Sequence, residues 1–350
     1  MKRILLVSSG YYRGEKTHID QIKAMNNISF DLITNKQDQT SNESTYNFSL
    51  PSLIKIKKLI QINQYSCIHC HGFKASVFIR ILNIVCKLPP IIYTIHGFHC
   101  AYKKWSLKAW IQRYLEKQLK HQQDHTICVS TSDQQSAIKH QCIIESKSSV
   151  ICNGVSLSNH LNHASPVTMF NKDDIICIST GTLEWRKGFE VIIEAANHLK
   201  NKPNIKFVFI GDGPLKKELT NTIKQLKLSN QIYLAGYQSD VRAWLQHSDI
   251  YISASRWEGL PYGILEAFQY NLPTIASNAP GIRDCITHNK NGYLFELNNS
   301  NDLADKLMRL INDPNKQTQF IDESNRRLRN EFSKDNMIEQ IQSIYEQYKT

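Results

Sequence analysis

Short apolar runs rich in β-branched residues recur along the chain, and longer amphipathic stretches separate them. The runs cover residues 4–8, 30–34, 67–70, 91–95, 126–130 and 150–152, and then 175–179, 206–210, 232–234, 250–253, 274–276 and 293–295. A strand that is apolar on both faces is typical of a parallel sheet covered by helices on either side. Two such series predict an α/β chain with two Rossmann-like domains.

The boundary between the two domains is expected within Ser156–Asp174, whose Asn, Ser and His content is typical of a linker. We expect an N-terminal domain over residues 1–165, a C-terminal domain over 166–332 and a final helix over 333–350. The apolar positions of that helix form one stripe: Met337, Ile338, Ile341, Ile344 and Tyr345. This stripe needs a partner, and a return of the helix to the first domain is one way to bury it.

The charge of the chain is unevenly distributed. The net charge of +11 falls within residues 1–165, whereas residues 166–350 are neutral overall. An anionic partner is therefore expected for the first domain. Nucleic acid is disfavoured as that partner, because the sequence shows neither a nucleic-acid-reading module nor basic residues interleaved with aromatic ones.

The most basic segment, Lys103–Lys120, predicts an amphipathic helix. Its apolar positions are Leu107, Trp110, Ile111, Tyr114, Leu115 and Leu119, with Arg113, Lys117 and Lys120 beside them. Such a helix either packs its apolar side on the sheet or lies on an anionic membrane surface. The other basic residues that would extend this face are Lys55, Lys57, Lys58, Lys74, Arg80 and Lys87.

Neither an export signal nor a membrane-spanning run is recognisable, and the nine cysteines are scattered, mostly inside apolar runs. We therefore expect a cytoplasmic protein with reduced thiols, peripheral at most on the inner face of the membrane. The segment Cys67–His71 fits the C-x-x-C-H pattern of haem attachment, and His96, His99 and Cys100 would be further metal ligands. A plain buried strand is the favoured interpretation, since no second C-x-x-C is present.

Two glycine turns follow strands of the second domain. The first precedes Arg186 and Lys187, and the second contains Gly211 and Gly213. Glycine turns with adjacent cations at the carboxyl end of a strand are suited to binding an anion.

The most informative stretch runs from Ser255 to Ala267. It carries Glu258 in a loop, Gly259, Pro261 at the expected first position of a helix, Tyr262, Gly263 and then Glu266 about one turn inside that helix. Two carboxylates that flank the amides of a helix start can accept hydrogen bonds from the hydroxyls of a sugar and of a ribose. A ligand that carries both a sugar and a ribose would have a diphosphate between the two, and Arg186 and Lys187 would neutralise its charge.

This set of motifs resembles glycosyltransferase family 4. The spacing of Glu258 and Glu266 matches its E-x7-E motif, and Arg-Lys-Gly at 186–188 and Gly-Asp-Gly-Pro at 211–214 match as well. Looser matches are Asn153-Gly154-Val155, Asn271-Leu272-Pro273 and Asn291-Gly292-Tyr293-Leu294. The resemblance implies a GT-B fold, with two Rossmann-like domains facing a central cleft, and a retaining transferase that uses a nucleotide-diphosphate sugar.

The resemblance also implies roles for individual residues. Glu266 would bind the ribose, Glu258 would lie near the transferred sugar, and Lys187 would contact the diphosphate. The expected donor-binding residues are Arg186, Lys187, Gly211, Gly213, Glu258, Gly259, Pro261, Tyr262, Gly263 and Glu266. The expected acceptor-binding residues are Gly10, Gly14 and His96, and the expected catalytic residues are Glu258, His96 and Lys187. One departure is Thr182, where the family often has an arginine.

No Asp-x-Asp occurs in the chain, so we expect no metal at the diphosphate, no cofactor and activity that survives EDTA. Among the first-domain carboxylates, Glu15, Asp20 and Asp133 are the nucleophile candidates, and none is well placed by sequence. The expected reaction moves a hexose or HexNAc from a nucleotide sugar, preferably UDP-linked, to a glycan or polyprenyl-diphosphate-linked acceptor in surface polysaccharide synthesis. The alternatives are a nucleotide-sugar 2-epimerase of the same fold and a non-catalytic basic protein that binds membranes or nucleic acid.

Overall fold

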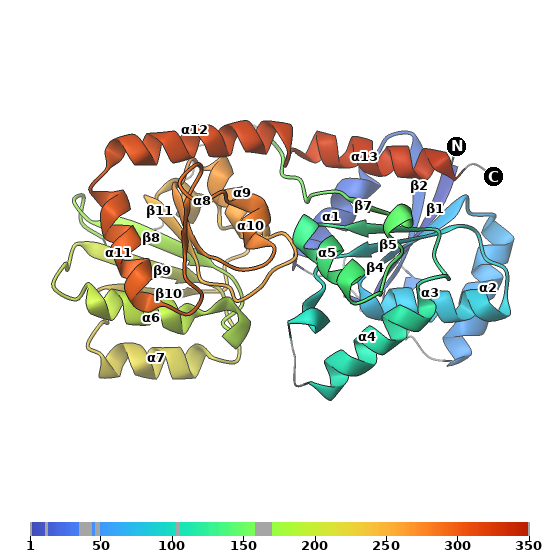
Figure 1. The fold of residues 1–350 in the computed structure, drawn as a ribbon, viewed down its shortest axis with the longest axis horizontal. Helices are drawn as coiled ribbons and strands as arrows, with labels where there is room; N and C mark the ends of the chain where they lie inside the picture. The colour runs from blue at the N-terminus through green and yellow to red at the C-terminus, as the bar shows by residue number, and fades with distance from the viewer. Residues whose placement is uncertain are drawn as a thin grey trace. The chain divides into compact units, whose positions relative to one another are not determined.

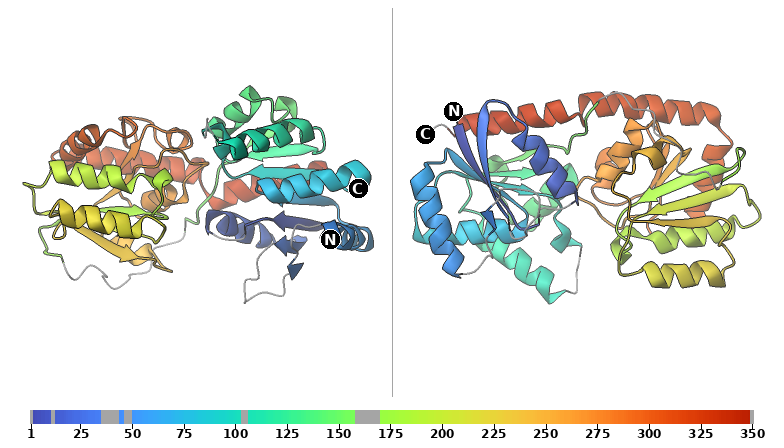
Figure 2. Two further views of the ribbon diagram at one scale, coloured as in Figure 1. Left: turned by 90° about the horizontal axis from the view of Figure 1, so that it is seen from below. Right: turned by 180° about the vertical axis from the view of Figure 1, so that it is seen from behind.

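The computed structural model describes residues 2–10, 13–34, 44–45, 50–102, 106–157 and 170–348. The chain forms two compact units. Unit 1 comprises Met1–Gly154 and Lys334–Thr350, and unit 2 comprises Val155–Ser333. In each unit, helices lie on both sides of a parallel sheet (Figures 1 and 2).

Unit 1 contains a seven-stranded parallel sheet with the order β3-β2-β1-β4-β5-β6-β7. Its strands are β1 (Lys2–Ser8), β2 (Ile28–Thr34), β3 (Ser44–Thr45), β4 (Cys67–His71), β5 (Ile91–Ile95), β6 (His125–Cys128) and β7 (Ser148–Val150). Its helices are α1 (Arg13–Lys23), α2 (Leu50–Asn63), α3 (Phe73–Val85), α4 (Leu107–Leu119), α5 (Thr131–Lys139) and α13 (Lys334–Gln347). Five of the strands match predicted runs. The predicted run 150–152 shares only Val150 with β7, and the short edge strand β3 was not predicted.

The alternation of side chains along β1 shows why the apolar runs form central strands. Ile4 and Leu6 pack into one apolar cluster, while Leu5 and Val7 pack into another. Successive residues of a strand point to opposite faces of the sheet, so a run that is apolar at every position supplies both clusters. All four side chains are fully buried.

The final helix, α13, belongs to unit 1, as its apolar stripe allowed. Met337, Ile341 and Tyr345 pack with Ile4 and Leu6 in the same apolar cluster. The Tyr345 hydroxyl also lies 2.6 Å from Nδ1 of the buried His69 on β4. Helix α13, near the end of the chain, therefore covers the face of the sheet to which Ile4 and Leu6 of β1 point.

Unit 2 contains a six-stranded parallel sheet with the order β10-β9-β8-β11-β12-β13. Its strands are β8 (Ile175–Thr180), β9 (Ile205–Ile210), β10 (Ile232–Gly236), β11 (Ile250–Ser253), β12 (Thr274–Ser277) and β13 (Tyr293–Phe295). Its helices are α6 (Phe189–His198), α7 (Lys216–Gln225), α8 (Arg242–Gln246), α9 (Tyr262–Gln269), α10 (Ile282–Cys285), α11 (Ser300–Ile311) and α12 (Pro314–Asn330). All six strands match predicted runs.

The strand order reverses once in each sheet, between β1 and β4 in unit 1 and between β8 and β11 in unit 2. At such a switch point the connections leave the sheet in opposite directions. The loops at the carboxyl ends of the strands then border a crevice where ligands of open α/β sheets bind. The loops after β8 and β11 and those after β1 and β4 are therefore the places to look for a site.

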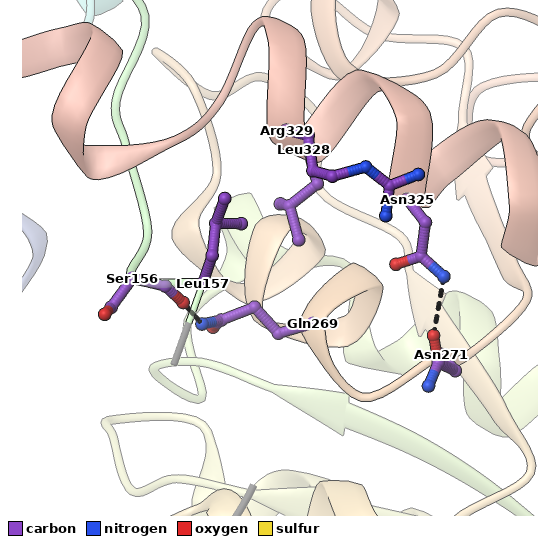
Figure 3. Close-up of a pocket in the computed structure, with 7 residues that line it drawn as sticks. All are labelled: Ser156, Leu157, Gln269, Asn271, Asn325, Leu328 and Arg329. Atoms are coloured by element: carbon purple, nitrogen blue, oxygen red, sulfur yellow. Dashed lines mark hydrogen bonds between the residues drawn. The ribbon is translucent and has the colours of Figure 1, made fainter. Parts of the chain in front are cut away.

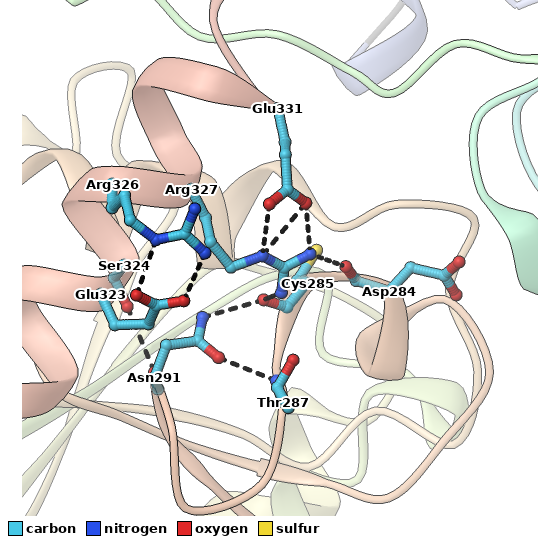
Figure 4. A network of polar contacts seen from close by, with 9 residues as sticks. All are labelled: Asp284, Cys285, Thr287, Asn291, Glu323, Ser324, Arg326, Arg327 and Glu331. Atoms are coloured by element: carbon cyan, nitrogen blue, oxygen red, sulfur yellow. Dashed lines mark hydrogen bonds and ion pairs between the residues drawn. The ribbon is translucent and has the colours of Figure 1, made fainter.

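The Asn-Gly element at 291–292 has a structural role (Figure 4). The buried Asn291 side chain accepts a hydrogen bond from the backbone of Thr287 at 2.8 Å and donates to the carbonyl of Cys285 at 3.0 Å. Ser324 on α12 donates to the Asn291 carbonyl, and Arg327 on α12 donates to the Cys285 carbonyl at 2.6 Å. These bonds attach α12 to the segment between α10 and β13.

All nine cysteines lie in the described part of the chain, and none forms a disulfide. Across the described ranges, no helix combines the length and the apolar character needed to cross a membrane.

Candidate active site

The loops that follow β8 and β11 meet at the switch point of unit 2. The backbone amide of Arg256, after β11, donates to the carbonyl of Arg186, after β8, at 2.8 Å. The Arg256 guanidinium also lies over the Trp185 ring and pairs with Glu190 on α6 at 2.6 Å. The two loops are thus fixed to each other by contacts within the protein.

Glu258 is the centre of this site. Its carboxylate lies 2.6 Å from Nη1 of Arg186 through one oxygen and 2.6 Å from Nζ of Lys187 through the other. Only 8% of the residue is exposed. Burial alone would raise the pKa of this carboxyl, but the charges of Lys187 and Arg186 outweigh it and lower the pKa to about 2. Glu258 is therefore ionised at any physiological pH.

Both cations expected at the diphosphate are held by carboxylates in this structure. Lys187 binds Glu258, and Arg186 binds Glu258 and, at 2.9 Å, Glu184. Although burial opposes it, the pKa of Arg186 is raised by these two carboxylates. A ligand that needs the two cations must therefore compete with Glu258 for them.

Glu266 lies four residues into α9, one turn inside the helix as predicted. Burial raises the pKa of its carboxyl, and the charge of the nearby Lys187 partly offsets the rise. Among the described residues, none forms a hydrogen bond or an ion pair with this carboxylate. Glu266 is thus close to the Glu258 cluster and has its hydrogen-bonding capacity open to a ligand.

The start of α9 differs by one position from the prediction. Pro261 stands at the N-cap, with φ −74° and ψ 112°, and Tyr262 is the first helical residue. The extended backbone at Pro261 turns the loop carrying Glu258 and Gly259 into the helix. The hydroxyl of Tyr262 is buried and has no hydrogen-bond partner in the described part of the chain.

Two of the predicted glycines are required by packing within the protein. At Gly211, a Cβ atom would lie 1.7 Å from the carbonyl oxygen of Gly181. At Gly263, it would lie 2.4 Å from the Tyr251 hydroxyl and 2.8 Å from the Thr180 hydroxyl. A side chain at either position would displace the neighbouring strand end, so these glycines shape the site whether or not a ligand touches them.

A pocket of about 230 Å³ lies elsewhere in unit 2 (Figure 3). It is lined by Ser156, Leu157, Gln269, Asn271, Asn325, Leu328 and Arg329. Asn325 donates a hydrogen bond to Asn271, whose backbone has the left-handed φ of 55° that glycine commonly adopts after a helix. This pocket includes none of the predicted site residues.

In unit 1, the predicted acceptor residues lie near the switch point between β1 and β4. Gly10 donates its backbone amide to the Ser8 hydroxyl at 3.2 Å, and Ser8 donates to Glu15 at 2.5 Å. Burial raises the pKa of the Glu15 carboxyl to about 7. Gly14 lies inside the first turn of α1, which begins at Arg13.

The other two nucleophile candidates of unit 1, Asp20 and Asp133, contact residues of their own surroundings. Asp20 lies on the exposed side of α1, 3.9 Å from Lys16. Asp133 accepts a hydrogen bond from the Phe98 backbone at 2.9 Å within the first turn of α5. Of the three, only Glu15 lies beside the switch point.

His96 follows β5 and lies beside His18 and His71. The sequence did not single out His18, and it pointed to His71 only as part of the C-x-x-C-H pattern. Its Nε2 is 3.0 Å from Nδ1 of His71, at the end of β4, and its ring packs edge-on against His18 of α1 at 4.9 Å. Ring nitrogens of the three lie within 4.8 Å of one another, an arrangement that could hold a metal ion. The signal that could have indicated His71 is its place at the end of a strand next to β5.

The two cysteines of the C-x-x-C-H pattern do not join a ligand cluster. Cys67 and Cys70 belong to apolar clusters on opposite faces of the sheet, since they are three residues apart on β4. Burial raises the pKa of both thiols to about 12, so they are protonated. The strand interpretation is confirmed.

Two family models match the chain. The model described as glycosyltransferase family 4 matches residues 30–159, and the model described as glycosyl transferases group 1 matches residues 163–327.

Known proteins give the same class. An Escherichia coli UDP-Gal:alpha-D-GlcNAc-diphosphoundecaprenol alpha-1,3-galactosyltransferase is 29% identical over 275 residues, covering 75% of this chain and 71% of that protein. The putative glycosyltransferase EpsD of Bacillus subtilis is 27% identical over 306 residues, covering 84% of this chain and 80% of that protein. The solved structure of Anabaena Alr3699/HepE in complex with UDP and glucose superposes with a TM-score of 0.86 at 19% identity, covering 99% of this chain and 100% of that one.

The fold and the site define a GT-B glycosyltransferase. With family models over both halves, the chain belongs to the glycosyltransferases of family 4.

We expect Glu258→Gln to lower the stability of unit 2 by about 3 kcal/mol at neutral pH, because Lys187 and Arg186 lose a buried carboxylate. The folded-state pKa of Glu258 lies below its ordinary value of 4.5, so its contribution is present above that value and is lost as the pH falls toward 2. Thermal melts of both proteins across this range measure the difference. Glu218→Gln on the exposed side of α7 is the matched control, and a difference that stays constant down to about pH 2 would contradict the ion-pair origin.

Proposed function

We propose that this glycosyltransferase moves a hexose or HexNAc, with retention of configuration, from a UDP-sugar to a hydroxyl of a glycan or lipid-linked oligosaccharide. The setting would be surface polysaccharide synthesis. The observation that carries the proposal is the cluster of Glu258, Arg186, Lys187 and Glu266 at the switch point of unit 2. It offers two cations to a diphosphate and one open carboxylate to the hydroxyls of a ribose.

Similar proteins support the choice of donor and acceptor. The Escherichia coli relative is named for UDP-Gal as donor and a diphosphoundecaprenol-linked sugar as acceptor. The superposable Anabaena structure contains UDP. A lipid diphosphate acceptor would also suit the basic character of residues 1–165.

In the proposed reaction the acceptor hydroxyl attacks the anomeric carbon on the face from which the diphosphate leaves. The bond between the anomeric carbon and the diphosphate oxygen breaks, and the proton of the hydroxyl passes to the leaving diphosphate. Lys187 and Arg186 stabilise the negative charge that develops on that group. The diphosphate competes with Glu258 for the two cations, which frees this carboxylate to accept hydrogen bonds from the transferred sugar.

The remaining predicted site residues have positioning roles in this proposal. Glu266 accepts hydrogen bonds from the ribose hydroxyls, and His96 donates to an oxygen of the transferred sugar or of the acceptor. Gly10 and Gly14 lie at the start of α1, where the acceptor would bind. Holding the reactants in this arrangement supplies much of the rate, and no protein nucleophile is required.

The donor assignment is tested by thermal shift with a panel of nucleotide sugars on wild type and Glu266→Ala. We expect UDP-sugars to stabilise the wild type most, and Glu266→Ala to bind them about 10- to 100-fold more weakly, because charged hydrogen bonds to the ribose are lost. Glu194→Ala, on the exposed side of α6, should behave as wild type. Equal stabilisation of Glu266→Ala and wild type would remove Glu266 from the donor site, and turnover to an epimer without acceptor would indicate the epimerase.

We also propose that the transfer requires no metal ion, because Lys187 and Arg186 supply the positive charge that a metal would bring to the diphosphate. Turnover should therefore be unchanged after dialysis against EDTA. Loss of activity with the chelator that manganese restores would contradict this proposal. Replacing Lys187 by Gln should lower kcat under either condition, since the charge comes from the protein.

The exposed side of α4 supports attachment to an anionic membrane. Leu107, Trp110, Ile111 and Tyr114 form one stripe and are 73%, 56%, 45% and 51% exposed. The interpretation in which this side packs on the sheet is therefore wrong. Leu119 is buried on the opposite side, and residues 103–105 of the predicted helix lie outside the described residues.

Neighbouring α3 also exposes apolar side chains. Ile81, Ile84 and Val85 are 43%, 60% and 73% exposed, and α3 and α4 are joined by the buried ion pair of Arg80 with Glu116 at 2.8 Å. Arg80 was expected on the basic face, but it is fully buried because it neutralises Glu116. Lys74 on α3, Lys87 just after α3, and Lys108 and Lys117 on α4 are exposed.

We propose that this surface lies on an anionic bilayer, with its apolar side chains among the acyl chains and its lysines at the headgroups. Wild type should sediment with vesicles containing phosphatidylglycerol, less so at high salt, and should remain in solution with pure phosphatidylcholine. Trp110→Ser with Ile111→Ser should abolish binding, whereas Lys217→Glu on α7 of unit 2 should leave it unchanged. Equal sedimentation with both lipids, or none with either, would contradict the proposal.

A further inference from the structure

Three imidazoles lie in a row toward the switch point of unit 1. His69 and His71 are two residues apart on β4, so they share one face of the sheet, and their rings are 4.2 Å apart. His96, after β5, lies next to His71, with the ring centroids 5.3 Å apart and the planes at 23°. Burial, followed by the charge of neighbouring histidines, lowers the pKa of all three rings.

The contact between His71 and His96 requires a proton on one of the two facing nitrogens. Nδ1 of His71 and Nε2 of His96 are 3.0 Å apart, the distance of a hydrogen bond between two ring nitrogens. Two neutral imidazoles can form this bond only if one nitrogen carries a proton and the other presents its lone pair. Either His71 donates to His96, or His96 donates to His71.

The environment of His71 decides between the two arrangements. Its other nitrogen, Nε2, is buried and has no hydrogen-bond partner among the described residues. If His96 were the donor, the proton of neutral His71 would stand on Nε2 as a buried N–H without an acceptor. Orphaned buried N–H groups are rarer than under-satisfied acceptors, so His71 carries its proton on Nδ1 and donates it to His96.

We propose that His71 is the positioning residue of His96. Its Nδ1–H holds Nε2 of His96 as an acceptor and thereby fixes the His96 proton on Nδ1. His71 is fully buried, whereas His96 is partly exposed. Nδ1–H is then the group that His96 offers to an oxygen of the transferred sugar or of the acceptor. The substrate contact rests on the proposed function, whereas the protonation state of His96 does not.

The ring of His71 is itself supported by His69, which in turn contacts Tyr345 of α13. The ring of His69 packs against that of His71 at a tilt of 37°. His69 is held at both nitrogens, by the Tyr345 hydroxyl at 2.6 Å and the Thr94 hydroxyl at 2.7 Å. A side chain of α13 therefore supports the row of rings that ends at His96.

The protonation state of His96 is measured by long-range ¹H–¹⁵N correlation of the imidazole rings in histidine-labelled, metal-free protein at neutral pH. We expect His96 as the neutral Nδ1–H form in wild type and as a mixture in His71→Phe, which keeps a ring but lacks the donor. His71→Asn should restore the wild-type form, because its side-chain amide can donate from near the position of Nδ1. His125→Phe is the control and should leave His96 unchanged, because His125 lies at the amino end of β6 whereas His96 follows the carboxyl end of β5.

An Nε2–H or charged His96 in the wild type would overturn the proposal. So would one equivalent of Zn²⁺ shifting His18, His71 and His96 together, because the nitrogens of the hydrogen bond would then be metal ligands. In transferase assays, His71→Phe should lower kcat about tenfold or more with little change in the donor KM, and His71→Asn should recover most of it. If the chain transferred no sugar, only this kinetic arm would fail and the spectra would still decide the role of His71.

Discussion

The buried ion pair of Glu258 with Lys187 and Arg186 is the interaction on which the account of unit 2 depends. Each oxygen of the carboxylate lies 2.6 Å from one cation, and the group is almost wholly buried. Buried charges are stable only when they are paired, so the two loops after β8 and β11 hold each other in place through this contact. The same pairing keeps two cations at the switch point, where an anionic ligand can take them over.

The fold could be predicted from the sequence because its strands are apolar at every position. Eleven of the twelve predicted runs became strands, and the run 150–152 shares only Val150 with β7. Ile4–Val7 show the reason, since alternate residues supply two different clusters. The edge strand Ser44–Thr45 escaped prediction because a two-residue polar strand has no hydrophobic signal. Glu258 and Glu266 were placed correctly on loop and helix, because the turn residues between them mark a strand-to-helix junction.

What the sequence could not provide was contact between segments far apart in the chain. The sequence predicted that Lys187 and Arg186 bind a diphosphate, but it did not indicate that Glu258 binds both of them in this structure. The contact of His71 with His96 was not predicted, because the two residues are 25 positions apart and only the pairing of β4 with β5 brings them together. Periodicity predicted the stripe on α4 but not its exposure, which depends on how α4 packs on α3 through Arg80 and Glu116.

Calorimetric titration of UDP into Glu258→Gln tests the central claim most directly. If the carboxylate holds the cations that the diphosphate needs, removing its charge should let UDP bind at least as tightly as to wild type, although transfer of the sugar is lost. Lys187→Gln should weaken UDP binding in the same experiment. UDP binding to Glu258→Gln that is about tenfold weaker than to wild type would contradict the account.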